Sequence, residues 1–143
     1  LPWCTNSIVH TSKPNPEKPN ITHMEATLEV GFPPFFSEQY TSDVTLDHAR
    51  HIKAQLHEKC AGQTLSHMVC NWHFVPNKAT PRSTKVDFEL EFSFSNSAHQ
   101  TLTSAVFNQV VETMQNTFIK RCEEVHGPPS HERMVLVSHK DAS

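Results

Sequence analysis

Signals of several common activities are absent from this 143-residue chain. Its only glycines are Gly31, Gly62 and Gly127, each near the end of an expected element, so no glycine-rich loop can cradle a phosphate. No G-x-S-x-G segment is present, which removes a familiar arrangement for a nucleophilic serine. The twelve lysines and arginines are scattered and the formal net charge is -3, so nucleic acid is not an expected partner.

Long apolar runs and closely spaced cysteines are also missing. No run approaches the roughly 18 apolar residues that cross a bilayer, so the chain is not expected to span a membrane, and its first residues are not a signal peptide. C-x-x-C pairs of the kind found in structural zinc sites do not occur. The even number of cysteines instead predicts two disulfides in an oxidising compartment, formed by Cys4, Cys60, Cys70 and Cys122.

The segment with the clearest pattern is Thr84–Ser95. Apolar residues alternate with polar ones over five apolar positions, from Val86 to Phe94, which is typical of a strand with one buried face. The same alternation predicts strands at His23–Phe32 and Ser66–Val75, and the short apolar run Met134–Val137 is expected to form a last strand.

Two helices are expected between these strands. The first begins at a cap at Ser42 or Thr45, ends at Gly62, and has apolar residues at spacings of three or four: Leu46, Ala49, Ile52, Leu56 and Cys60. The second begins with the capping box Ser97–Gln100, carries an apolar stripe from Leu102 to Cys122, and ends at Gly127.

This order of elements predicts an α+β fold. Strand, helix, strand, strand, helix, strand is the order of a ferredoxin-like βαββαβ sandwich, in which an antiparallel four-stranded sheet has two helices on one face. Right-handed crossovers would give the strand order 4-1-3-2. Residues 1–22 are rich in proline and are expected to form an extended arm or linker, whereas residues 23–143 form the domain.

The open face of such a sheet would gather carboxylates and histidines, namely Glu25, Glu29, His67, His73, Asp87, Glu89 and Glu91. We interpret this face as solvated or as binding a protein partner, because an acidic face without a recognisable motif is a weak signal of catalysis. His67 and His73 are too far apart along one strand to hold one ion, and His48 and His51 lack a third ligand, so neither a metal nor another cofactor is expected.

In its order of elements over residues 23–139, the chain resembles the SEA domain, an extracellular ferredoxin-like module of adhesion and matrix proteins. The resemblance implies a spacer and interaction role. It does not imply self-cleavage, because the Gly-Ser-Val-Val-Val segment that many SEA domains cleave is missing from the connection Val75–Ser83. Asn20, in an Asn-Ile-Thr acceptor, is the expected glycosylation site of such a secreted protein.

The leading hypothesis is therefore a non-enzymatic extracellular interaction module of a cell-surface or matrix protein that binds a protein partner. A protease prodomain or inhibitor is the alternative, and a small hydrolase or metal-binding protein is a third. Two disulfide pairings fit the expected topology: Cys60–Cys122 with Cys4–Cys70, or Cys60–Cys70 with Cys4–Cys122.

Overall fold

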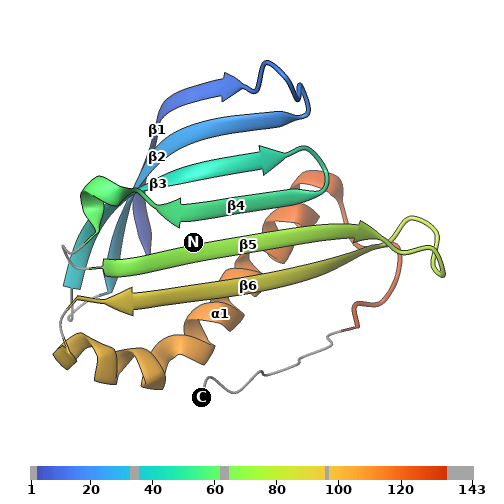
Figure 1. The fold of residues 1–143 in the computed structure, drawn as a ribbon. Helices are drawn as coiled ribbons and strands as arrows, with labels where there is room; N and C mark the ends of the chain where they lie inside the picture. The colour runs from blue at the N-terminus through green and yellow to red at the C-terminus, as the bar shows by residue number, and fades with distance from the viewer. Residues whose placement is uncertain (1–2, 33–35, 62–64, 96, 135–143) are drawn as a thin grey trace.

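The computed structural model describes residues 3–32, 36–61, 65–95 and 97–134. These residues form one antiparallel sheet and one long helix, which crosses behind the sheet (Figure 1). The strands follow one another in the sheet in the order in which they occur in the chain, from β1 to β6. Their bounds are Cys4–Pro14, Ile21–Phe32, Phe36–Asp47, His51–Leu56, Leu65–Pro76 and Thr84–Phe94, and the helix α1 is Ser97–His126.

The α+β class and the antiparallel sheet are confirmed, but the ferredoxin-like arrangement is wrong. The described residues contain six strands and one helix, and every strand pairs with its neighbour in the chain, so the order 4-1-3-2 does not occur. The strands expected at His23–Phe32, Ser66–Val75 and Thr84–Ser95 correspond to β2, β5 and β6, and the second expected helix is α1. Most of the expected last strand, Met134–Val137, lies outside the described residues.

The helix expected between residues 42 and 62 is a β-hairpin. Asp47 ends β3, His51 begins β4, and Ala49 occupies the turn between them with a positive φ of 61°. The residues that suggested a helix also alternate along β4, where Ile52, Ala54 and Leu56 share one face. Only Glu58–Cys60 is helical, as the single 3-10 turn η1. The helical spacing of the apolar residues did not decide the structure, because β4 is stabilised by its pairing with β3 and β5.

The proline-rich segment expected as an arm contains β1, which pairs along most of its length with β2. Two register shifts, between Cys4 and Asn6 and between Val9 and Thr11, interrupt this pairing. Such bulges bend a strand, which contributes to the curvature of the sheet in Figure 1. Pro14 is tolerated because β1 is an edge strand, whose outer side needs no hydrogen-bond donor.

Residues that face each other across antiparallel strands point to the same side of a sheet, so the register defines two faces. We call the side facing α1 the inner face. On it lie Met24, Ala26, Leu28 and Val30 of β2, Tyr40, Ser42, Val44 and Leu46 of β3, Ile52, Ala54 and Leu56 of β4, Met68, Cys70, Trp72 and Phe74 of β5, and Phe88, Leu90 and Phe92 of β6. These positions are apolar apart from Tyr40 and Ser42, and the polar residues Thr22 and Glu38 share the same face near the strand ends.

Candidate functional site

The helix covers only part of the inner face. It lies chiefly against β6, where the rings of Phe107 and Phe92 are 5.5 Å apart, and it reaches β5 through Phe118, whose ring is 5.0 Å from that of Trp72. Trp72 also contacts Phe88, at 4.3 Å between ring centroids. This aromatic seam fixes α1 along one side of the sheet. The inner faces of β2, β3 and β4 make no comparable contact with the described part of α1.

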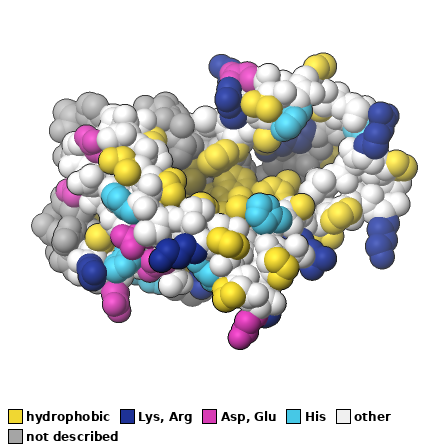
Figure 2. All heavy atoms as spheres, turned by 90° about the horizontal axis from the view of Figure 1, so that it is seen from above, with side chains coloured by type: hydrophobic (Ala, Val, Ile, Leu, Met, Phe, Trp, Pro, Cys, Tyr) yellow, Lys and Arg dark blue, Asp and Glu magenta, His cyan; other side chains and the backbone are white. Residues whose placement is uncertain are grey.

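The apolar interior is consequently poorly filled. Among the described residues, only Val30 and Met68 are buried hydrophobic side chains, at 8% and 7% exposure, and no large side chain is fully buried. Figure 2 shows a hollow in the molecule whose visible floor is made of hydrophobic side chains. A folded chain of this size normally buries a dense core. The hollow between the inner face and α1 is therefore the candidate binding site.

Tyr40 is the most unusual polar residue of the inner face. It faces Leu28 across the β2–β3 pair. Burial raises the pKa of its phenol to about 12, and the nearby thiols of Cys70 and Cys4 contribute further increases. The phenol therefore stays protonated, and able to donate a hydrogen bond, throughout the physiological pH range.

Cys70 lies on β5 with its thiol on the same face. Burial raises the pKa of this thiol, while a hydrogen bond from Trp72 acts in the opposite direction. A protonated thiol is a poor nucleophile, so Cys70 is not set up for thiolate chemistry. Cys4 donates a hydrogen bond to the backbone oxygen of Asn6 at 3.4 Å.

The other face of the sheet, which we call the outer face, does not gather the expected acidic cluster. Glu25 and Glu29 lie on β2, and β3 and β4 separate them from the remaining residues on β5 and β6. The second group is compact: His67 is 3.6 Å from Glu91, and His73 faces Asp87, while Glu89 faces Asn71. A partner-binding role for these residues stays a prediction.

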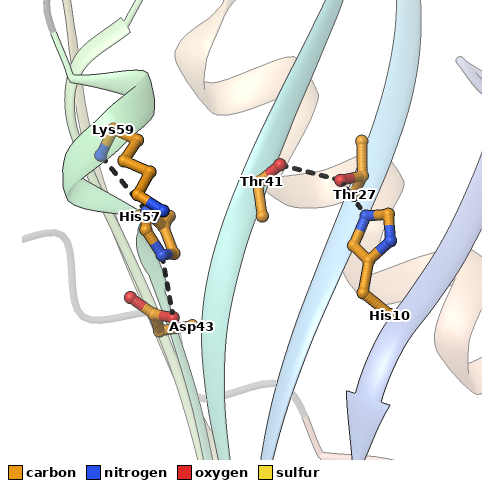
Figure 3. Close-up of polar contacts among 6 residues, drawn as sticks. All are labelled: His10, Thr27, Thr41, Asp43, His57 and Lys59. Atoms are coloured by element: carbon orange, nitrogen blue, oxygen red, sulfur yellow. Dashed lines mark hydrogen bonds and ion pairs between the residues drawn. The ribbon is translucent and has the colours of Figure 1, made fainter.

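Histidines of the outer face form polar contacts of their own (Figure 3). Thr27, only 6% exposed, is hydrogen-bonded to His10 Nε2 and to Thr41 Oγ1, both at 2.7 Å. His57 Nδ1 accepts a hydrogen bond from the Lys59 backbone N–H, so its Nε2 carries the proton and points to Asp43 at 3.9 Å. These contacts join neighbouring strands and η1, and they give His10 and His57 structural roles.

The outer face offers no assembled metal site within the described ranges. No group of three His, Cys, Asp or Glu residues is close enough there to hold an ion. Of the two histidines weighed as a chelating pair, His48 lies in the β3–β4 turn and the ring of His51 is stacked on that of His73, with 4.1 Å between their centroids. A depression of about 400 Å³ on β1 to β4 is lined mainly by polar residues such as Lys13, Glu25 and Asp43.

The expected disulfides are wrong. Cys4, Cys60, Cys70 and Cys122 are all free. The Cys60–Cys122 bridge required Cys60 to end a long helix beside the second one, but Cys60 ends only the single turn η1. With no disulfide, one of the two arguments for an oxidising compartment is lost.

The sequence patterns did not identify Tyr40 and Ser42 as site residues, because a helix was expected to begin at Ser42 or Thr45 and Tyr40 to lie in the connection before it. The available signal was the alternation of Tyr40, Ser42, Val44 and Leu46.

None of the helices in the described residues is long and apolar enough to cross a membrane.

Comparison with known proteins identifies the family. A family model described as polyketide cyclase / dehydrase and lipid transport matches residues 1–119. Two relatives are both named coenzyme Q-binding protein COQ10, mitochondrial: one from Drosophila melanogaster, 34% identical over 81% of this chain and 47% of its own length, and one from Dictyostelium discoideum, 33% identical over 89% and 57%. The chain thus spans about half the length of these curated relatives. No solved structure matches it significantly.

These findings overturn three expectations. The resemblance to an SEA domain is wrong, because the matching family is a different one. An extracellular spacer or adhesion module, secreted and glycosylated, is also wrong, since the relatives are named as mitochondrial ligand-binding proteins. The glycan expected at Asn20 loses its basis with secretion. The chain belongs to the polyketide cyclase / dehydrase and lipid transport family.

Proposed function

We propose that this protein binds coenzyme Q, a quinone with a long isoprenoid tail, in the hollow between the inner face and α1. The observation that carries the proposal is the apolar inner face of a six-stranded sheet on which only Val30 and Met68 are buried hydrophobics among the described residues. The names of the two relatives supply the ligand. The proposal places the protein in mitochondria, as a binding protein and not as an enzyme.

The chemistry of the hollow suits such a ligand. Part-exposed apolar side chains on β2, β3 and β4, such as Leu28, Val44 and Ile52, would lose their remaining contact with water against an isoprenoid tail. Burial of apolar surface contributes about 25 cal/mol per Å², so a tail of several isoprene units would bind with a substantial favourable free energy. Ligand pockets are typically apolar with a few polar groups, as here.

Tryptophan fluorescence offers a direct test, because the chain has only two tryptophans and Trp72 lies on the inner face. A Trp3→Phe variant leaves Trp72 as the single reporter. We expect decylubiquinone, a short-tailed analogue, to quench Trp72 saturably with one site per chain, and we expect quinone in solvent extracts of the purified protein. Quenching that rises linearly without saturation, as free quinone causes by collision, would contradict the proposal.

A further inference from the structure

The inner face carries two hydroxyl groups that have no hydrogen-bond partner in the described part of the chain. Tyr40 and Ser42 are two residues apart on β3, so their side chains point to the same face and lie about 7 Å apart along the strand. Ser42 is only 5% exposed. Polar groups that are withdrawn from bulk water are usually hydrogen-bonded, so two hydroxyls without a partner among the described residues are candidates for a ligand contact.

These hydroxyls are open to the hollow. Among the described residues, no side-chain oxygen or nitrogen that is shut off from solvent lacks a partner. The two hydroxyls have no partner in the part of the chain that the structure describes, so their oxygens are not shut off from solvent, and because both lie on the inner face we take the hollow as the space that reaches them. A ligand in that space can therefore complete their hydrogen bonding.

Other polar groups nearby are already used or have the wrong chemistry. The Trp72 indole N–H is directed to Cys70, and the Cys4 thiol donates to the backbone of Asn6. Glu38 faces Val30 and so shares the inner face, but its carboxyl group does not offer the hydroxyl donor that a carbonyl oxygen requires. Ser7 of β1 shares this face but is exposed, so Tyr40 and Ser42 are the free hydroxyl donors that the described part of β3 offers to the hollow.

We propose that Tyr40 and Ser42 anchor the head group of the ligand, with the Tyr40 hydroxyl donating to a quinone carbonyl oxygen and Ser42 to a neighbouring carbonyl or methoxy oxygen. The inference rests on the proposed binding of coenzyme Q and deepens it by assigning one end of the hollow to the head. A quinone ring offers acceptors and no donors, which complements two free hydroxyls. The apolar positions Val44 and Leu46 continue the same face along β3, where the tail would begin.

The assignment separates head recognition from tail recognition, so the test uses one ligand with a head and one without. Decylubiquinone binding is followed by Trp72 fluorescence in the Trp3→Phe background, and squalene, a hydrocarbon without a polar head, is measured by competition. Tyr40→Phe removes the hydroxyl and keeps the ring, and Ser42→Ala removes the second one. Thr45→Val is the matched control, because Thr45 lies on the outer face of the same strand.

We expect Tyr40→Phe to weaken decylubiquinone binding about tenfold, because the carbonyl oxygen of the quinone would then be buried without a hydrogen-bond donor. Ser42→Ala should weaken the binding less. Squalene affinity should not change, and Thr45→Val should bind like its parent. Unchanged quinone affinity in Tyr40→Phe, or an equal loss for quinone and squalene, overturns the anchor while leaving coenzyme Q binding intact. If the parent protein binds squalene but not quinone, the proposed function itself fails.

Discussion

At the scale of single residues, the informative side chain is Tyr40, because it is the only tyrosine in the chain. Its pKa can therefore be read directly from the ultraviolet absorbance of tyrosinate. We expect a midpoint at about pH 12 in the folded protein and at the ordinary value of 10.0 after denaturation. A folded-state midpoint at the ordinary value would show that the phenol is exposed to water and that the hollow does not enclose it.

The same shift predicts how stability depends on alkaline pH. The folded-state pKa is raised, so the unfolded chain loses the Tyr40 proton first as the pH increases. Stability from the neutral phenol is fully present below pH 10.0 and is lost between there and about 12. Two pKa units correspond to about 3 kcal/mol at most. Urea titrations should show a smaller alkaline loss in Tyr40→Phe than in the parent protein, and parallel losses would refute this origin.

At the scale of elements, the sequence predicted those whose pattern is local and unambiguous. Val86 to Phe94 alternate without interruption, and Ser97 to His126 have both a capping signal and a helical stripe, so β6 and α1 were identified correctly. Residues 46–60 fit both helical and strand spacing, and the turn at Ala49 has no glycine to mark it. Propensity does not resolve such a segment, because the decisive contacts are with β2 and β5.

The strand β1 was missed for a different reason. Nearly all its residues are exposed, so it lacks the apolar alternation that marks a half-buried strand. It is held to the sheet by backbone pairing and by polar contacts such as the His10–Thr27–Thr41 chain. Thr41 and His10 are 14 and 17 residues from Thr27, so the local sequence does not indicate that they are hydrogen-bonded to it.

This polar chain predicts a cost for Thr27→Val. The substitution keeps the shape of the side chain but leaves His10 and Thr41 without their shared hydroxyl, so we expect a loss of about 1–2 kcal/mol. Urea denaturation gives the free energy of unfolding, and faster amide hydrogen exchange in β1 would locate the effect. Thr45→Val, which removes a long and exposed contact with His23 at 3.3 Å, should cost much less. Equal losses of unfolding free energy in the two variants would mean that the hydrogen bonds of Thr27 with His10 and Thr41 stabilise the fold no more than the exposed Thr45–His23 contact does.

At the scale of the whole molecule, the function depends on a space that no segment specifies by itself. The inner face is contributed by strands from Ile21 to Phe94, and its incomplete cover follows from where α1 lies against β6. The sequence correctly gave an apolar face to β2, β5 and β6. It could not show that this face lines a hollow, because a filled core and a ligand site require the same alternation.

A test at this scale fills the hollow and leaves its walls in place. Ala54 lies near the centre of the inner face, between Val44 on β3 and Cys70 on β5, and its small side chain is part-exposed. Ala54→Trp should occupy the space of the ligand and reduce decylubiquinone binding at least tenfold. Overpacking a dense core costs typically 1–3 kcal/mol, so a large ring accepted with little loss of stability would itself indicate empty space.

The neighbouring residue provides the matched control, because successive side chains of a strand point to opposite faces. Gln55→Trp adds the same ring to the exposed outer face of β4, and it should leave quinone binding unchanged. Both variants add a tryptophan, so binding is better measured by isothermal calorimetry than by fluorescence. If Ala54→Trp unfolds the protein, the interior was already full. If Ala54→Trp folds and binds quinone as tightly as Gln55→Trp does, the ligand lies elsewhere. Blocked binding in a stable Ala54→Trp protein is the result that a ligand-sized hollow requires.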